Sequence, residues 1–337
     1  MQILPFCLPT LLTMLFMVLA YADSTWIFAV LLFAVSMINP YWGTFSSFDL
    51  KRTYTFFHHS AVMSIFKGIN GLFFVLFNIW AAAFCVLHPF TAFSFATFVY
   101  GVVVVNSGFG LSLAHDLTHA RQSLQRALGE LLMLQNGFFY LSYDHVFIHH
   151  PHVGTPADPA SAMLNENLYA YFRRSLGERM RLLLRGSDGV KTVRQMRLYQ
   201  AVRWKMAACT VWLIVAFFIS KYLFILVAAQ FFFVILVYET TTYIQHYGLQ
   251  RSPHEKIRLH HSWNSFDRLY NYLYFFMPVH SLHHAHAQPA AGDWGPVMPL
   301  SFPRMVLLAF RPAQWFRTMN PLVLELQEKQ ALVPAYE

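Results

Sequence analysis

The sequence predicts an all-α integral membrane protein, and three observations indicate this fold class. Hydrophobic residues make up 56% of the 337 residues and charged residues only 12%, about half the charged share of a soluble domain. The apolar residues gather in runs of about 20, the length that a helix needs to cross a hydrocarbon core about 30 Å thick. Most Lys and Arg lie in the connections between these runs, as is typical of helical membrane proteins.

Six runs are expected to form transmembrane helices. The first has no charge before Asp23, and it lacks the basic start and small-residue cleavage site of a signal peptide, so we interpret it as a span. The last two runs meet at Lys221 and are expected to form a tight hairpin. The expected spans are residues 3–22, 26–47, 69–88, 91–114, 206–220 and 222–246.

The basic residues also predict the orientation of the chain. They concentrate in the loops at 48–68 and 115–205 and in the tail at 247–337, so the positive-inside rule puts these segments and both termini on the cytoplasmic side. Because no internal repeat or linker divides the sequence, residues 1–337 are predicted to form a single membrane domain with a helical base and a cytoplasmic cap.

The net charge of +8 and the three cysteines argue against other classes of protein. No basic stripe interleaved with aromatic residues accompanies the charge, so nucleic acid is not an expected partner. Cys7, Cys85 and Cys209 lie inside apolar runs, without the spacing of metal ligands or of a disulfide framework. We expect them to pack as small apolar side chains.

Histidine is the second unusual feature of the composition, with 17 residues. Four motifs contain the histidines of interest: HDLTH, HVFIHH, YIQHYG at the end of the last span, and HSLHH. One histidine pair at a helix end is an ordinary surface feature, but four motifs expected at one membrane face predict a metal centre, because side chains three or four residues apart share a helix face. The candidate metal ligands are His115, His119, His145, His149, His150, His246, His280, His283 and His284.

The ligand type indicates which metal is expected. Neutral imidazole binds iron, zinc and copper, whereas magnesium and calcium prefer oxygen ligands. One ion takes about four to six ligands, so nine candidates fit two ions. With no thiolate nearby, the redox-active choice is non-haem iron, which activates O2 where coordination positions stay open. The expected cofactors are therefore two iron ions, with O2 as co-substrate.

Four carboxylates near these motifs are candidates for orienting an imidazole by accepting the proton of its second nitrogen. Asp116 and Asp144 adjoin histidines, and Asp158 lies in TPADP, where capping of a turn is the alternative. Glu239 lies inside the last span, two helical turns before His246, and an ionisable residue at membrane depth is a functional candidate. We expect Glu239, Asp116 and Asp144 to contribute to catalysis, either as metal ligands or beside the ligands.

The motifs, taken in order, resemble those of a known family. HDLTH, DHVFIHHPHVGTPADPASA, ETTTYIQHYGL, HSWNS and HSLHHAH resemble the integral-membrane alkane monooxygenases, which belong to the membrane fatty acid desaturase and hydroxylase di-iron superfamily. The likeness runs from about residue 90 to 320 and implies six transmembrane helices with a cytoplasmic di-iron centre. It also implies that the nine histidines hold two irons and that Glu239 lies at or beside them.

The sequence departs from the family pattern beside the expected ligands. The acidic residues of the first two motifs are Asp116 and Asp144, where the family commonly has Glu, and Leu282 stands where the last motif usually has Asp. Thr242 and Gln245 also differ from the family's usual NYxEHYG. The ligand positions are retained while their surroundings have changed.

The resemblance implies an enzyme, a non-haem di-iron monooxygenase. It would hydroxylate an unactivated C–H bond, such as a terminal methyl group, of a hydrophobic substrate such as an alkane, alkyl chain or alkylaromatic that enters from the membrane lipid. No flavin or cysteine-ligated iron motif is present, so electrons must come from a separate rubredoxin- or ferredoxin-like donor with its reductase. The basic face would attract such an acidic carrier.

Three alternatives stay open from the sequence. A desaturase or terminal-alkene-forming enzyme of the same superfamily, acting on fatty-acyl chains, would use the same histidines. An intramembrane zinc hydrolase would use HDLTH, with Asp116 in place of the general base of HExxH, but it would leave the other histidines unexplained. A metal transporter would need polar residues through several spans, whereas Glu239 is the one clearly buried acid.

Overall fold

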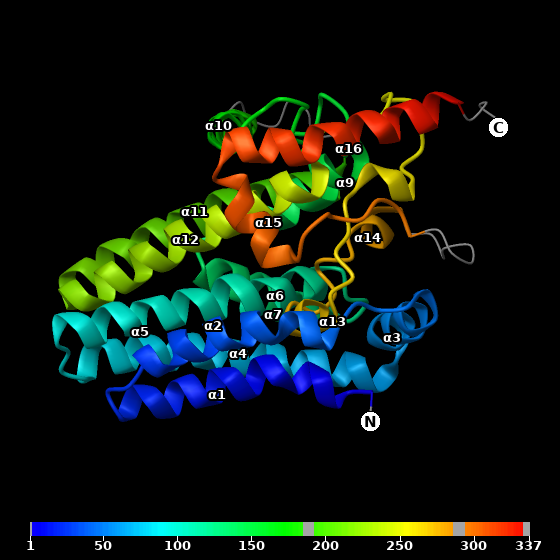
Figure 1. The fold of residues 1–337 in the computed structure, drawn as a ribbon. Coiled ribbons are helices and arrows are strands. Elements are labelled where there is room, and N and C mark those ends of the chain that lie inside the picture. Colours follow the sequence, from blue (N-terminus) through cyan, green and yellow to red (C-terminus); the bar gives the residue numbers. More distant parts are fainter. Residues whose placement is uncertain (1, 185–191, 286–293, 333–337) are drawn as a thin grey trace. The chain divides into compact units, whose positions relative to one another are not determined.

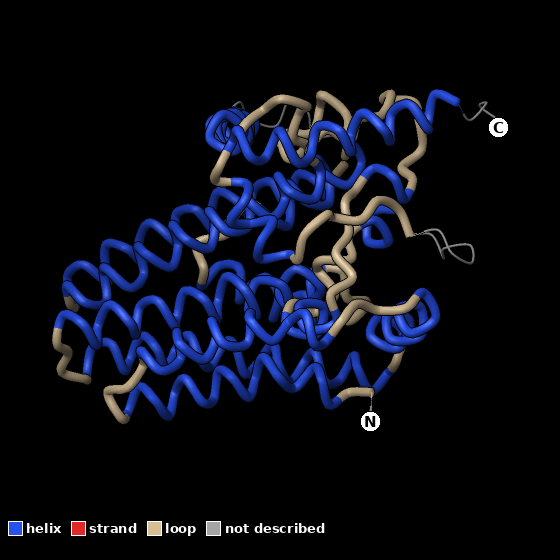
Figure 2. The backbone as a smooth tube through the Cα atoms, in the orientation of Figure 1, coloured by secondary structure: helices blue, strands red, loops and turns tan. Residues whose placement is uncertain are grey.

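The computed structural model describes residues 2–184, 192–285 and 294–332. Helices dominate these residues (Figure 2), and strand pairing within them is limited to two isolated bridges. The expectation of an all-α membrane protein is confirmed. The chain divides into two compact units, and the expectation of a single domain stays a prediction. The first unit comprises Met1–Tyr143, Thr192–Tyr238 and Phe266–Pro278, and the second comprises Asp144–Lys191, Glu239–Ser265 and Val279–Glu337.

The first unit contains most of the long helices. Its helices α1, α2, α4 and α5 lie side by side (Figure 1), and α7 packs against both α4 and α6. The helices are η1 (Leu4–Cys7), α1 (Leu8–Tyr21), α2 (Trp26–Trp42), α3 (Ser47–His59), α4 (Ala61–Leu87), α5 (Ala92–Val104), the π-helical η2 (Val105–Gly110), α6 (Leu111–Thr118), α7 (Ser123–Gln135), α11 (Val193–Ile219), the first part of α12 (Lys221–His246) and α13 (Arg268–Leu273). The short α8 (Leu141–Asp144) ends at the second unit.

Phe16 of α1 lies at the centre of an aromatic core in the first unit. Its ring centroid lies 5.1 Å from that of Phe28, 5.7 Å from Phe98 and 6.2 Å from Phe77. These rings come from α2, α5 and α4, so one side chain joins four helices. Gly101 makes this close approach possible, because a Cβ at this position would lie 2.1 Å from the Phe16 ring.

Within the described residues, five helical segments are long and apolar enough to cross a membrane: Leu4–Tyr21, Ala61–Leu87, Ala92–Thr118, Gln195–Ile219 and Lys221–His246. They correspond to five of the six expected spans. Two of them begin about ten residues earlier than expected, because polar caps start the helices outside the apolar run. The Ser60 side chain caps α4, and Thr192 forms a capping box at the start of α11. A single residue, Ser220, separates α11 from α12, which confirms the hairpin expected at Lys221.

The remaining expected span, 26–47, was predicted too long. Helix α2 ends at Trp42, before the end of the expected span. Gly43 ends the helix with a φ of 66°, a left-handed conformation that favours glycine. The next residues form a β-bridge at Thr44, and α3 starts three residues later. The six-span count and the sidedness stay predictions.

An amide network ties helices together inside the first unit. The side chains of Asn78 and Asn106 exchange hydrogen bonds of 3.1 and 3.0 Å. Gln230 donates to Asn78 at 2.9 Å and to Asn136 at 2.8 Å. All four side chains are buried, and their contacts connect α4, the π turn η2, the end of α7 and α12.

The second unit contains shorter helices and carries three of the four histidine motifs. Tyr243, Tyr247 and Trp315 form its aromatic core, with ring centroids 5.0 to 5.4 Å apart. The expected loop at 115–205 and tail at 247–337 are largely helical in the described residues. The elements of this unit are the π-helical η3 (His145–His149), α9 (His150–His152), α10 (Leu168–Leu184), the end of α12, η4 (Leu259–His261), α14 (Ser281–Ala285), α15 (Phe302–Ala309) and α16 (Pro312–Leu332).

Candidate metal centre

A π-helical turn, η3, carries the second histidine motif. A π turn closes hydrogen bonds between residues five apart, one more than in an α-helix, so residues five apart face the same side. His145 and His150 accordingly meet, with 2.9 Å between their Nε2 atoms. The spacing of the sequence had instead suggested His145 and His149 as the pair, and their ring centroids lie 5.4 Å apart.

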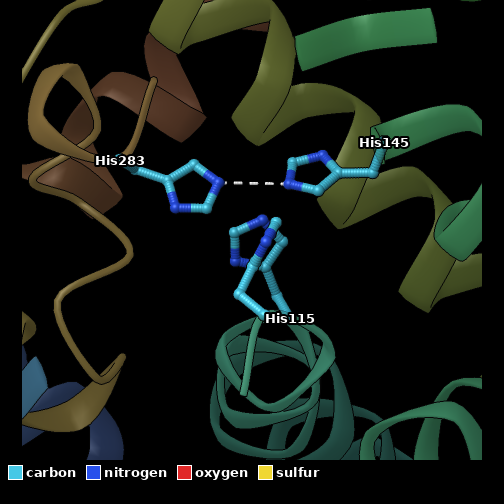
Figure 3. A group of neighbouring side chains, drawn as sticks. His115, His145 and His283 are labelled. Atoms are coloured by element: carbon cyan, nitrogen blue, oxygen red, sulfur yellow. Dashed lines mark hydrogen bonds between the residues drawn. The ribbon is translucent and has the colours of Figure 1, made fainter. Parts of the chain in front are cut away.

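A three-histidine group consists of His145, His150 and His283. Their Nε2 atoms form a triangle with sides of 2.9, 3.0 and 3.1 Å. Figure 3 shows His145 and His283 pointing toward each other from two different segments. His145 is buried, and the other two rings are partly buried.

A four-histidine group consists of His149, His246, His280 and His284, all of them buried. Their Nε2 atoms follow one another at 3.1 Å from His149 to His284, 2.9 Å to His280 and 3.1 Å to His246. Burial first, and then the neighbouring imidazoles, lower the pKa of His284 far below its usual value. This ring is therefore neutral, which is the form that binds a metal.

Adjacent histidines divide between the two groups. His149 belongs to the four-histidine group and His150 to the three-histidine group. His284 and His283 divide in the same way. Because two different segments each supply both groups, the groups are neighbours within the second unit, as two ions of one centre require.

The geometry of the Nε2 atoms fits metal ions better than hydrogen bonds. A neutral imidazole Nε2 either carries a proton or does not, so in a triangle of three Nε2 atoms at least one pair brings two donors or two acceptors together. A cation resolves this conflict, because every nitrogen then presents a lone pair to it. For metal–nitrogen bonds of about 2.1 Å, ligands at right angles lie roughly 3.0 Å apart, close to the observed spacings.

Asp158 contacts one ring of the four-histidine group and also caps the turn that follows it. Its Oδ2 accepts from His149 Nδ1 at 2.8 Å and from Ser161 Oγ at 2.6 Å, and its Oδ1 accepts from the Ala160 N–H at 3.0 Å. Burial raises the pKa of Asp158, but His149 and Ser161 outweigh burial and hold that pKa below its usual value. The carboxylate therefore keeps the proton of His149 on Nδ1 and leaves Nε2 for a metal.

Asp144 and Glu239 both contact helix α10. Arg179 donates to Asp144 Oδ2 from Nε at 2.9 Å, and its Nη1 pairs with Glu239 Oε1. Ser175 and Tyr171 donate to Glu239 Oε2 at 2.9 and 3.2 Å. Burial raises the pKa of Asp144 to about 6, against the opposing effect of the Arg179 guanidinium.

The first histidine motif lies in the first unit. His115 is buried near the end of α6, His119 follows that helix, and their ring centroids lie 5.4 Å apart. Asp116 forms an ion pair with Lys67 at 2.9 Å, and one of its oxygens lies 3.5 Å from His58 Nδ1. An ion-paired Asp116 is poorly suited to the general base that the hydrolase alternative requires.

A third group contains Glu255, His260 and His261. Glu255 Oε1 lies 3.6 Å from His261 Nε2 and 3.9 Å from His260 Nε2. His261 Nδ1 accepts the Arg258 N–H at 3.0 Å, so the proton of this neutral ring resides on Nε2. That tautomer opposes metal binding at Nε2.

The sequence interpretation missed the residues that hold the carboxylates. Arg179 was counted among the charges that determine sidedness, although it is buried. Tyr171, Ser175 and Arg179 recur every four residues on α10 and contact the same carboxylate. This polar stripe in an otherwise mixed helix was the signal available in the sequence.

These observations put the chain in the class of helical membrane proteins with buried histidine groups that could hold metal ions. The family model described as fatty acid desaturase matches residues 89–290, more than half of the chain. The chain therefore belongs to the fatty acid desaturase family and is an integral membrane protein, and it has several similar curated relatives.

Those relatives are similar over about two thirds of this chain. An alkane 1-monooxygenase of Pseudomonas putida is 31% identical over 66% of this chain and 58% of its own length. An alkane 1-monooxygenase of Acinetobacter baylyi is 29% identical over 65% of this chain and 57% of its own. The xylene/toluene monooxygenase hydroxylase component XylM of Pseudomonas putida is 25% identical over 61% and 58%. The chain thus spans about three fifths of the length of the curated relatives that it matches.

Proposed function

We propose that this protein is a membrane di-iron monooxygenase that hydroxylates a C–H bond of a hydrophobic substrate with O2. The observation that carries the proposal is the pair of imidazole groups. Their Nε2 atoms lie at spacings that suit metal coordination, and hydrogen bonds alone cannot match a donor with an acceptor for every Nε2 pair of the three-histidine group. Neutral imidazole suits iron, and iron bound there would supply the activation of O2. The relatives' names, alkane 1-monooxygenase and xylene/toluene monooxygenase, favour hydroxylation over desaturation.

The nine histidines of the four motifs are proposed to hold the two ions. The three-histidine group would contribute to one ligand set. The four-histidine group would supply the other. The presence of His115 and His119 on one helix turn and the family's motif order support this assignment.

The other polar residues of the site are proposed to support the ligands rather than to bind iron. Asp158 keeps His149 in the tautomer that presents Nε2. Glu239 and Asp144 are held by donors from α10, so both carboxylates already have partners. The apolar helices of the first unit would receive the substrate from the lipid and exclude water.

The electron source and the membrane belong to the same proposal. A separate rubredoxin- or ferredoxin-like carrier with its reductase would supply electrons, attracted by the net charge of +8. The protein would lie in a bacterial inner membrane with both termini and the metal centre in the cytoplasm.

The first test is metal content of the detergent-purified protein, because it needs no substrate. We expect about two irons per chain, and a loss in both His283→Ala and His284→Ala, which alter different groups. His260→Ala, outside both groups, serves as the control and should retain the iron. One zinc per chain, or iron retained in both variants, would contradict the proposal.

The second test identifies the reaction. Membranes containing the protein are given medium-length alkanes and alkylaromatics, a reduced carrier and ¹⁸O2, and the products are analysed by mass spectrometry. An alcohol that contains ¹⁸O supports hydroxylation. A new double bond without ¹⁸O would instead assign the chain to the desaturase alternative.

A further inference from the structure

One buried arginine joins two segments that carry metal-ligand candidates. The Arg179 guanidinium donates to Asp144 at 2.9 Å through Nε and pairs with Glu239 through Nη1. The side chains of Arg179, Asp144 and Glu239 are exposed by only 2%, 4% and 0%. A planar guanidinium reaches two carboxylates at once, in fixed directions, as a lysine ammonium cannot.

The two carboxylates stand at comparable distances along the chain from two ligands of one group. Asp144 directly precedes the π turn that ends at His149, and Glu239 precedes His246 by two turns of α12. The rings of His149 and His246 have centroids 4.9 Å apart. Arg179 therefore connects the supports of two rings that must keep a fixed spacing to share an ion.

We propose that Arg179 is a positioning residue that fixes the spacing of His149 and His246 by clamping Asp144 to Glu239. The proposal rests on the metal-binding role proposed above for the four-histidine group. It assigns helix α10 the task of a scaffold for the metal centre, which neither the histidine motifs nor the family description assigns to it.

Two further residues of α10 strengthen the clamp. Ser175 accepts from Arg179 Nη1 at 2.9 Å and donates to Glu239 Oε2 at 2.9 Å. Tyr171 lies 3.2 Å from the same oxygen. Both oxygens of Glu239 are thereby engaged from one helix face, so this carboxylate is held against α10.

A simpler role for Arg179 would be charge balance. It is one cation beside two buried carboxylates, and its removal leaves both without that counter-charge, which destabilises a folded protein wherever it occurs. The test must therefore separate the loss of charge from the loss of the clamp. A triple variant, Arg179→Met with Asp144→Asn and Glu239→Gln, removes all three charges and with them the imbalance.

The probe is Co²⁺, whose visible absorption reports ligation by imidazole. The detergent-solubilised full-length protein is stripped of metal and titrated with Co²⁺ against a competing chelator. We expect Arg179→Met to weaken one of two Co²⁺ equivalents by about tenfold to a hundredfold, the usual effect of losing a residue that orients ligands. Arg179→Lys should weaken it as well, because one ammonium cannot hold both carboxylates. Arg181→Met, exposed on the same helix, is the matched control.

The triple variant decides between the two roles even if Arg179→Met alone does not fold. Weak Co²⁺ binding in a triple variant whose thermal unfolding is close to that of the unmodified protein supports the clamp. Full Co²⁺ affinity in the triple variant overturns it and leaves charge balance as the role. Full affinity in Arg179→Met also overturns it. If the unmodified protein binds no Co²⁺ through imidazole, the proposed function fails first, and the two failures are distinguishable.

Discussion

Replacing Asp158 by Asn is expected to weaken metal binding although the two side chains have nearly the same shape. The carboxylate accepts three hydrogen bonds, from His149 Nδ1 and Ser161 Oγ on one oxygen and from the Ala160 N–H on the other. An amide has one oxygen and one NH2 group, so it cannot accept on both sides. Whichever way it turns, one donor of the protein faces another donor.

The two orientations of the new amide weaken metal binding to different extents, and neither strengthens it. With the amide oxygen toward His149, the ring keeps its tautomer, but the hydrogen bond loses its ionic character, which roughly halves its strength. With the NH2 toward His149, Nδ1 must accept, and the ring proton moves to Nε2, where it blocks the metal. We expect about tenfold to a hundredfold weaker binding, equivalent to about 1.4 to 2.7 kcal/mol.

The assay is competition between the protein and a chelator for Fe²⁺ under anaerobic conditions. The matched control is Glu166→Gln, which removes another carboxylate of the second unit, one that pairs with Arg174 at 2.7 Å. This control should lower the thermal stability without changing metal affinity. Equal affinity of Asp158→Asn and the unmodified protein, or equal losses in both variants, would refute the tautomer argument.

Three further predictions concern the first unit. Asn106→Leu removes one amide of the Asn78 pair and should lower the unfolding free energy by about 1–2 kcal/mol in a detergent unfolding titration. Adding Asn78→Leu should recover part of this loss. Strictly additive losses of unfolding free energy would contradict the pairing. Lys67→Met leaves Asp116 without its cation and should cost about 3–5 kcal/mol, whereas a loss under about 1 kcal/mol in the same titration would mean that the pair is effectively solvated. Burial lowers the pKa of His58 from 6.5 to about 4. The unfolded chain therefore binds more protons than the folded chain between these pH values, and stability falls as the pH is lowered through them. His58→Gln should reduce this fall in melting temperature, and an unchanged dependence of melting temperature on pH would contradict the argument.

The histidines that gather in the two groups were predictable, because imidazoles at fixed spacing are a local property of the sequence. Asp158 was predictable for a related reason, since a carboxylate nine residues after His149 can fold back through a turn. Which histidine joins which group was not predictable. That division depends on the π turn at 145–149, and a hydrophobic or propensity pattern does not distinguish a π turn from an α-helix.

Burial of two basic side chains was the other feature that the sequence did not reveal. A loop rich in Arg predicts cytoplasmic sidedness, and this general rule gave no reason to separate Arg179 from its exposed neighbours. Lys67 was assigned to the expected loop at 48–68 for a similar reason, because a charged side chain interrupts the apolar run. In the structure it lies within α4 and pairs with Asp116. Both buried cations pair with a carboxylate that is distant in sequence, and the sequence alone does not show such pairs.

The π turn of the second histidine motif has a consequence for anyone who shortens or grafts this segment. A π turn is equivalent to one extra residue inserted into an α-helix, and deleting a single residue such as Val146 would restore regular winding. Every nitrogen donor after the deletion would then rotate by about 100° about the helix axis. The composition of the motif would be almost unchanged, yet His149 and His150 would no longer face the groups that they face now. The length of this segment therefore determines the two histidine groups as much as the imidazoles themselves do.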